Sequence, residues 1–291
     1  MKKIAFIINP ISGTSDKKEL PDRIRSVLDG SVWEAPVIVQ TEYAGHGKEL
    51  ARAFAEQGFD VVVACGGDGT MNEVASGVIG TQTAFSIVPY GSGNGLARHY
   101  QFSMVPKEAL MQINEGSLHE MDYGVVNGVN FFCTCGTGFD AHISHVFAQA
   151  DGRGIINYLK AVVKEYFHYE PYEYNVRMTD GEEYRQKAFV VTFGNASQFG
   201  NNAYIVPNAS TEDGLLDICI LEPFKTYEVP KLAVQLFHGT IDQNMHVKML
   251  RAKEVVLTRD YEGEFHVDGE PIKLGKEVHV KIVSGELRIW R

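Results

Sequence analysis

The sequence predicts a two-domain protein, in which an α/β domain with a parallel sheet precedes a mainly antiparallel β domain. Up to about residue 117, short apolar runs alternate with helical patterns. That alternation is typical of a parallel sheet with helices on both faces. After Ser117, short apolar runs are separated by Gly, Asn or Asp turns, as in antiparallel sheets. We therefore expect domains at residues 1–122 and 123–284.

Periodicity and turn residues define the individual elements. In the first domain we expect strands at 2–8, 37–40, 60–64 and 84–88, and helices at about 17–28, 46–57, 70–79 and from 96. In the second we expect strands at 130–134, 172–178, 188–193, 216–221, 254–259 and 278–282, and helices at about 155–167 and 229–239. The turns Asp180-Gly181 and Asp268-Gly269 predict β-hairpins.

Composition excludes several classes of protein. The chain has 291 residues, 44% of them hydrophobic, and no apolar run of the ~20 residues that a membrane span requires. We therefore expect a soluble, cytoplasmic protein. A net charge of −10 argues against binding to nucleic acid and against strong electrostatic adhesion to anionic membranes. The four cysteines lack metal-ligand spacing and are expected to be reduced core thiols. His142 and His145 could share a helix face, but the sequence places no carboxylate beside them.

Three predicted strands each end in a loop rich in Gly, Ser or Asn. These loops are Asn9 to Ser15, Gly66 to Asn72, and Gly91 to Gly95. Because the carboxyl ends of parallel strands line one crevice, the loops should lie together and bind a ligand. Glycine-rich turns leave backbone N–H groups accessible to anions, and Asp68 at the tip of the middle loop could hold a metal ion or take a proton. The pattern predicts a phosphate site.

These motifs resemble those of the diacylglycerol-kinase-like lipid kinases, which include sphingosine and ceramide kinases. Asn9-Pro10-Ile11-Ser12-Gly13, Gly66-Gly67-Asp68-Gly69-Thr70-Met71-Asn72-Glu73 and Gly91-Ser92-Gly93-Asn94 stand in the family's order. Later segments are also similar, namely Asp122-Tyr123-Gly124, Gly136-Thr137-Gly138-Phe139-Asp140, Asp213-Gly214-Leu215 and Asp268-Gly269-Glu270. The resemblance implies an N-terminal domain of the NAD-kinase and diacylglycerol-kinase type, a C-terminal β-sandwich, and a last strand, 285–291, that returns to the first domain.

The resemblance also implies ATP and Mg²⁺ as cofactors, with phosphate transfer to the hydroxyl of a membrane lipid. The lipid could be diacylglycerol, phosphatidylglycerol or a sphingoid or ceramide, met peripherally at the membrane surface; a homodimer is left open. Basic residues near the loops are sparse, so neutralisation of the phosphates should rest on backbone dipoles and magnesium. The implied nucleotide-binding residues are Asn9, Pro10, Ser12, Gly13, Thr41, Gly66, Gly67, Asp68, Gly69, Thr70, Asn72, Gly91, Ser92, Gly93 and Asn94.

Carboxylates carry the remaining implied roles. Asp68 would act with magnesium or the γ-phosphate, Asp122 would join its magnesium network, and Glu270 would be the general base supported by Asp268. Asp213, with carbonyls of Ser210 and Leu215, would bind a structural magnesium. Asp140 would contact the acceptor head group.

Each assignment has a structural alternative. Thr41 could be a helix N-cap or turn residue, Glu73 a cap partner, and Asp140 architectural. Asp213-Gly214 and Asp268-Gly269 could be ordinary turns. The aromatic run 166–172 is expected to pack in the core rather than contact lipid. The rival functions are an NAD kinase, which shares the middle loop, and a nucleotide-binding regulator without catalytic activity.

Overall fold

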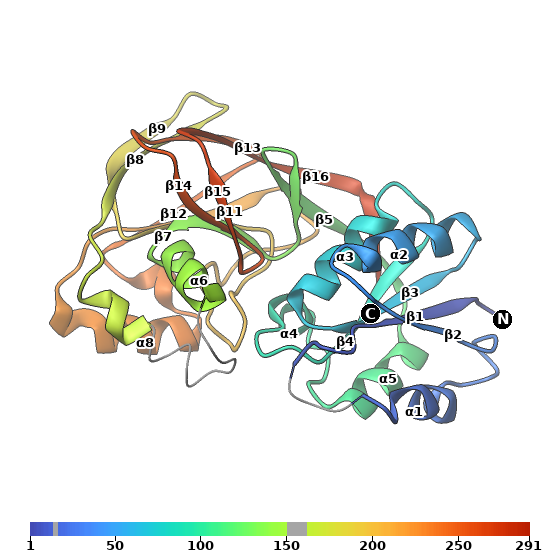
Figure 1. Ribbon diagram of the computed structural model, residues 1–291. Helices are drawn as coiled ribbons and strands as arrows, with labels where there is room; N and C mark the ends of the chain where they lie inside the picture. The colour runs from blue at the N-terminus through green and yellow to red at the C-terminus, as the bar shows by residue number, and fades with distance from the viewer. Residues whose placement is uncertain (14–16, 150–161) are drawn as a thin grey trace. The chain divides into compact units, whose positions relative to one another are not determined.

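The computed structural model describes residues 1–13, 17–149 and 162–291 (Figure 1). The chain divides into two compact units, one of Met1–Asp122 with Ser284–Arg291 and one of Tyr123–Val283. Among the described residues, no helix is long and apolar enough to cross a membrane. The α/β first unit and the antiparallel β-sandwich of the second confirm the predicted fold class.

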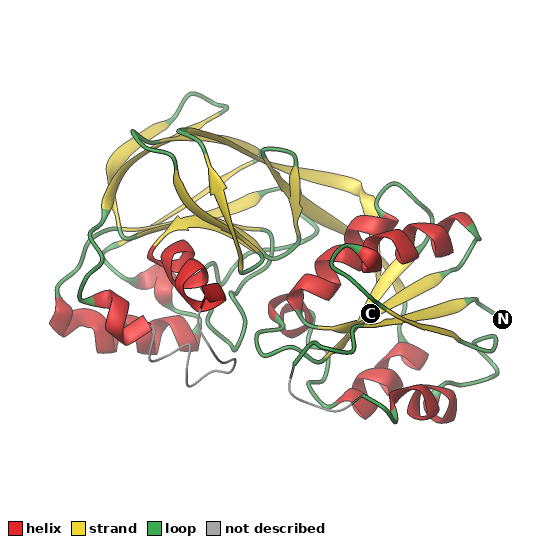
Figure 2. Ribbon diagram, viewed as in Figure 1, coloured by secondary structure: helices red, strands yellow, loops and turns green. Residues whose placement is uncertain are grey.

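The first unit is built on a parallel sheet with strand order β2-β1-β3-β4, followed by the end of β16. Helices α2 and α3 lie on one face of this sheet, and α1 and α5 lie on the other (Figures 1 and 2). The elements are β1 (Ile4–Ile8), α1 (Leu20–Val27), β2 (Val37–Gln40), α2 (His46–Glu56), β3 (Val61–Gly66), α3 (Asp68–Val78), β4 (Ala84–Pro89), α4 (Gly95–His99) and α5 (Pro106–Glu115). Strand β5 (Leu118–Val126) leads out of the unit.

The core of the first unit explains why its strands are apolar throughout. All residues of β1, β3 and β4 are buried, as expected for central strands covered by helices on both faces. Alternate residues of β1, including Phe6, pack against Leu20 and Ile24 of α1 and Ile113 of α5. On the other face, Gly77 of α3 allows close packing on α2, because an added Cβ would lie 2.6 Å from the Cβ of Ala51.

The second unit is a sandwich of two sheets. One contains β5, β6 (Val129–Phe131), β16 (Glu277–Trp290), β13 (Glu254–Thr258), β8 (Tyr172–Met178) and β9 (Glu183–Ala188). The other has the order β12 (Val247–Ala252), β11 (Leu216–Leu221), β10 (Val190–Gly194), β7 (Thr134–Gly138), β14 (Gly263–Val267) and β15 (Glu270–Leu274). Their facing side chains form one core that includes Phe193, Ile218, Leu257 and Val280.

Helices cover the outer face of the six-stranded sheet. These are α6 (Phe139–Gln149), a helical turn at 162–166, and α8 (Val229–His238), with 3₁₀ turns η1 (Thr226–Glu228) and η2 (Ile241–Gln243) beside α8. Phe139, Phe189 and Leu232 share a second core there. Part of the helix predicted at 155–167 lies outside the described residues. Tyr166 and Tyr169 pack against this core, which supports the packing interpretation of the aromatic run, although Phe167 is 69% exposed.

The predicted strand 130–134 is wrong in one respect: it is interrupted. The backbone N–H groups of Phe132, Cys133 and Thr134 donate to the carboxylate of Asp268, at 3.0, 2.8 and 3.1 Å. Because these donors point at one side chain, the chain bends between β6 and β7. The carboxylate of Asp268 thus interrupts a segment whose apolar pattern predicts one continuous strand.

Candidate active site

The first unit brings the three glycine-containing loops together at the carboxyl ends of β1, β3 and β4. Asn9 Nδ2 donates to Thr70 Oγ1 at 3.0 Å, which joins the first loop to the second. The backbone N–H of Tyr90 donates to the Gly66 carbonyl at 2.7 Å, which joins the third loop to the second. The loops therefore form one edge of the sheet, as the sequence pattern predicts.

Glycine is required where these loops touch. An added Cβ at Gly13, whose φ is +66°, would lie 1.8 Å from the Tyr90 carbonyl oxygen. An added Cβ at Gly91 would lie 2.6 Å from the Cα of Gly67. The backbones thus approach more closely than any side chain would permit, and they carry their N–H groups into the same small region.

Asp68 is the carboxylate that joins two of these loops. It is the first residue of α3, and its two oxygens accept hydrogen bonds from the backbone N–H groups of Asn94 and Gly95, both at 2.8 Å. Asp68 is only partly exposed, and by accepting these two N–H groups it also caps the start of α4. A carboxylate oxygen can accept more than one hydrogen bond or metal contact, so these two bonds are compatible with binding of a metal ion by Asp68.

Most other predicted nucleotide-binding residues lie in the same loops, but they differ in how far their side chains are exposed. The Asn94 side chain is buried and bonds to both the N–H and the carbonyl of Gly91, so it shapes the loop from inside. Thr41 is buried after β2, its N–H donating to the Ile8 carbonyl, and the N-cap of α2 is Gly45 rather than Thr41. Pro10 and Ser92 are exposed; Ser12, Gly69, Asn72 and Gly93 are partly exposed.

Glu73 is a cap partner, but for another helix. Its carboxylate accepts hydrogen bonds from the backbone N–H groups of Gly45 and Gly47, at 2.7 and 2.9 Å, at the start of α2. A carboxylate at a helix N-terminus satisfies unpaired donors and opposes the positive end of the helix dipole. This is the structural alternative that the sequence left open.

Lys17 is a basic residue whose position at the site the sequence did not indicate. Its side chain is buried, its ammonium group donates to the Ser12 carbonyl, and it lies 5.0 Å from the centre of the Tyr90 ring. Burial lowers the pKa of Lys17, although the nearby Cys65 opposes that change. Lys17 therefore supports the first and third loops from behind. Its proximity in sequence to the first loop was the only available signal.

In the second unit, the predicted base Glu270 begins β15 and is exposed. It follows Asp268 and Gly269, whose φ values of +48° and +85° form the tight turn of the β14–β15 hairpin. Because Asp268 also binds the backbone at 132–134, it anchors this hairpin to β6 and β7. Asp268 thus holds in place the turn that precedes Glu270, whose role as general base stays a prediction.

Asp140 forms a buried polar pair that sequence reasoning missed. Its Oδ2 lies 3.0 Å from His266 Nε2 and accepts a hydrogen bond from Thr192 Oγ1 at 3.1 Å. His266 is 2% exposed, and its Nδ1 has no hydrogen-bond partner among the described residues. These contacts favour the architectural alternative for Asp140, at the start of α6, while its role toward a head group stays a prediction.

The predicted structural magnesium at Asp213 does not fit the residues present. Asp213 Oδ1 accepts the N–H of Leu215 at 3.1 Å, and Oδ2 accepts a hydrogen bond from the Arg251 guanidinium. Arg251 also contacts Asp217 at 3.2 Å. The guanidinium from β12 thus already occupies one oxygen of Asp213, and its positive charge opposes a second cation there. Ser210 Oγ accepts the N–H of Glu212.

A catalytic magnesium, which the resemblance also implies, would bind at Asp68. Among the described residues, no group of three His, Cys, Asp or Glu side chains could hold a metal by itself. Magnesium often takes only one or two carboxylates together with substrate phosphates, so the single carboxylate of Asp68 fits such a site. Asp122 is 4% exposed in β5, and its participation stays a prediction.

Carboxylates do flank His142, contrary to the sequence expectation. Its Nδ1 and Nε2 lie 3.0 and 3.1 Å from Glu264 and Glu165, which come from β14 and from the helical turn at 162–166. This cluster connects α6 to two neighbours. All four cysteines are free and buried, as predicted.

A glycine-loop edge on a parallel sheet, and an Asp-Gly-Glu hairpin on a β-sandwich, are the features expected of the lipid kinase class that the sequence resembles. Comparison with known families agrees with that class. Residues 3–126 match the diacylglycerol kinase catalytic domain, and residues 133–291 match the YegS C-terminal NAD kinase beta sandwich-like domain. The chain therefore belongs to the diacylglycerol-kinase-like lipid kinase family.

Individual relatives support the same assignment. A Chromohalobacter salexigens protein named "Probable lipid kinase YegS-like" is 29% identical over 78% of this chain and 75% of its own. The Mycobacterium tuberculosis diacylglycerol kinase is 26% identical over 87% and 84%. A crystal structure titled as a diacylglycerol kinase from Bacillus anthracis has a TM-score of 0.74 at 19% identity, covering 99% of this chain and 96% of that one. An Archaeoglobus fulgidus NAD kinase in complex with ATP has a TM-score of 0.52 at 11% identity, covering 99% and 93%. These two structures share the fold.

Proposed function

We propose that this protein is a magnesium-dependent kinase that transfers the γ-phosphoryl group of ATP to the hydroxyl of diacylglycerol at a membrane surface. The observation that carries the proposal is the contact among three glycine-containing loops, two of which Asp68 joins, in a chain of the lipid kinase family. Diacylglycerol is chosen because several relatives of this chain bear the name diacylglycerol kinase.

The loops would bind the ATP phosphates mainly through backbone groups. The Gly67-to-Thr70 turn begins α3 without a side-chain cap from its N-cap residue, so the first N–H groups of the helix are suited to an anion. The contacts at Gly13, Gly67 and Gly91 hold these donors in one arrangement. Such preorganisation matters because phosphoryl transfer depends on alignment and charge neutralisation.

Magnesium, when bound with ATP at Asp68, would neutralise the phosphate charge. The attacking group is the lipid hydroxyl oxygen, which bonds to the γ-phosphorus as the bond from phosphorus to the ADP oxygen breaks. Glu270 would accept the proton that the hydroxyl loses. Its exposed position at a hairpin held by Asp268 is consistent with contact to a substrate.

The test is phosphate transfer from ATP by the purified protein with magnesium. Diacylglycerol, phosphatidylglycerol, sphingosine and ceramide dispersed in detergent, and soluble NAD, serve as acceptors. We expect a phosphorylated diacylglycerol, and at least roughly a hundredfold loss of turnover in Glu270→Gln and in Asp68→Asn. Glu262→Gln, which changes an exposed carboxylate directly before β14, is the matched control and should retain activity.

Other outcomes would replace the proposal. Transfer to NAD alone would identify an NAD kinase, which is the rival function because an NAD kinase shares the fold. ATP binding without transfer to any acceptor would indicate a nucleotide-binding regulator. Normal turnover in both variants would reject the assigned roles of Glu270 and Asp68.

A further inference from the structure

Helix α8 in the second unit carries apolar side chains on its solvent face as well as on its buried face. Pro230, Ala233, Val234 and Phe237 are exposed, and their spacing of i, i+3, i+4 and i+7 places them on one stripe. Val234 is 59% exposed and Phe237 is 48% exposed. A surface helix of a globular protein ordinarily has polar residues there, so this stripe requires an explanation.

The opposite face shows that α8 is firmly placed. Leu232 is 6% exposed in the core formed with Phe189 and Leu221. The Leu236 carbonyl accepts the backbone N–H of Tyr204 at 2.9 Å, and Gln235 Oε1 accepts a hydrogen bond from Asn244 Nδ2 at 2.6 Å. The helix therefore cannot turn its outer stripe inward without breaking these contacts.

One further exposed apolar side chain extends the surface beyond the helix. Tyr227 of η1 lies one turn before Pro230 and is 74% exposed. We call Tyr227, Pro230, Ala233, Val234 and Phe237 the α8 face.

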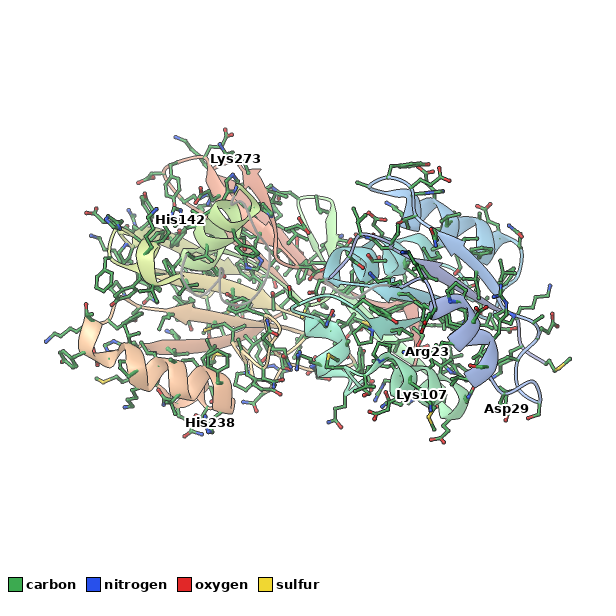
Figure 3. All side chains as sticks on the ribbon, turned by 60° about the horizontal axis from the view of Figure 1, so that its bottom comes forward. Arg23, Asp29, Lys107, His142, His238 and Lys273 are labelled. Carbon is green, nitrogen blue, oxygen red and sulfur yellow. The ribbon has the colours of Figure 1, made fainter. Side chains whose placement is uncertain are left out.

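The exposed charges in the segment that carries the α8 face are of one sign. From Pro223 to Lys248, the exposed ionisable residues are Lys225, Lys231 and His238, besides the Tyr227 hydroxyl, and no carboxylate is exposed. Figure 3 shows His238 on the outer side of α8. The acidic residues in this segment are partly buried: Glu228 bonds to the Lys225 N–H and to His246, and Asp242 to Asn208. This segment therefore brings exposed positive charge, and no exposed carboxylate, to the α8 face.

We propose that the α8 face inserts into the headgroup region of a phospholipid bilayer and holds the enzyme at its lipid acceptor. An apolar stripe edged by lysines, with an aromatic residue at either end, has the composition of an interfacial helix. The lysines would face anionic lipid phosphates, and the exposed Val234 and Phe237 would enter the acyl boundary. The inference rests on the proposed function, which requires a membrane acceptor.

The mode of attachment is chiefly apolar. Two lysines supply only weak attraction to anionic lipid, and the total charge of the protein opposes it. Binding should therefore occur with neutral phosphatidylcholine and increase moderately with phosphatidylglycerol. It should also resist salt more than a polybasic attachment would, because burial of apolar surface is not screened.

The experiment is sedimentation of the full-length protein with vesicles of phosphatidylcholine, with and without phosphatidylglycerol, in the absence of ATP. The variant Val234→Ser with Phe237→Ser should reduce partitioning to both vesicle types roughly tenfold, because two apolar anchors are lost. Lys225→Gln with Lys231→Gln should reduce only the increase caused by phosphatidylglycerol. Met111→Ser, which removes a 49% exposed apolar side chain from α5, is the matched control and should bind like the wild type.

Because vesicle binding is measured without nucleotide, its outcome is separate from that of the kinase assay. A protein that binds vesicles through this face but transfers no phosphate would disprove the proposed function alone. Equal partitioning of the Val234/Phe237 variant and the wild type, at matched melting temperature, would overturn the docking proposal. A second result would also overturn it: light scattering that shows a dimer for the wild type and a monomer for that variant, while vesicle binding is unchanged. In that case a second copy of the chain would cover the α8 face.

Discussion

At residues 67 and 91, two backbones meet at a distance that excludes any side chain. The Gly-Gly-Asp-Gly and Gly-Ser-Gly-Asn segments indicate turns and a ligand site from sequence. They do not indicate which glycine is required for contact between loops and which is required for conformation. In the structure, Gly13 is required both by its positive φ and by its contact with Tyr90, whereas Gly67 and Gly91 are restricted by their contact with each other.

Gly91→Ala should therefore destabilise the protein and weaken ATP binding. The added Cβ would lie 2.6 Å from the Cα of Gly67 and 2.7 Å from Asn94 Oδ1, so the loops must separate. Overpacking of this kind costs about 1–3 kcal/mol of unfolding free energy. Urea unfolding and ATP titration would measure both effects. Gly30→Ala, with no atom within 4 Å of the added Cβ, is the control and should change stability by less than about 0.5 kcal/mol.

Asp68 and Asp268 show the limit of residue-level prediction. Both were expected at the site on the basis of their turns, and both bind backbone N–H groups of other segments. Their partners lie 26 and 27 positions away for Asp68, and 134 to 136 away for Asp268. A local pattern of residues cannot identify partners at such separations, because the fold brings them together.

At the scale of elements, periodicity predicted strands and helices well where each element buries its own face. The helix predicted at 46–57 is observed as α2, and the strand predicted at 216–221 is observed as β11. The segment 130–134 differs because a long-range carboxylate takes its backbone donors. Intrinsic patterns therefore set the type of an element, while tertiary hydrogen bonds decide where it is interrupted.

The attachment of α6 should depend on pH through His142. Burial alone would lower the pKa of His142, but hydrogen bonds and charge from Glu165 and Glu264 outweigh burial and raise it above the usual 6.5. A raised pKa in the folded state contributes stability that is fully present below pH 6.5. That contribution is lost as the pH rises through the folded-state value.

His142→Gln should therefore lower the melting temperature most below pH 6.5, and the difference from wild type should shrink as the pH rises. Glutamine retains a polar side chain without the positive charge, so the comparison isolates the ionised form. Melting curves of both proteins across this range would measure the effect. A difference that is constant with pH would show that the contribution of His142 is packing alone.

At the scale of the whole molecule, strand β16, like β5, belongs to both compact units. Its residues up to Val283 lie in the second unit, and Ser284–Arg291 complete the parallel sheet of the first, where Ile289 pairs with Phe85. Trp290 is 6% exposed, donates through Nε1 to the Ile113 carbonyl at 2.9 Å, and contacts the Trp33 ring edge-on at 5.4 Å. The stability of the first unit thus depends on residues at the far end of the sequence.

Trp290→Ala should destabilise the first unit by about 3–5 kcal/mol, the usual cost of removing a large buried aromatic side chain. Because the chain has two tryptophans, Trp33 remains as the fluorescence reporter of that unit during urea unfolding. ATP affinity should fall under conditions where the unit is partly unfolded. A loss below about 1 kcal/mol would show that the C-terminal residues contribute little to the first core.

The sequence by itself determined the fold class, the three glycine-containing loops and the family, because these depend on local periodicity and on short motifs. Tertiary structure alone decided which carboxylates the fold already uses. Arg251 of β12 pairs with Asp213 at the turn before β11, Asp268 anchors a hairpin, and Lys17 supports the first loop from a buried position. It also decided that one face of α8 is left exposed. The physical reason is that hydrogen bonds and burial depend on groups distant in sequence, whereas turns and periodicity depend on neighbours.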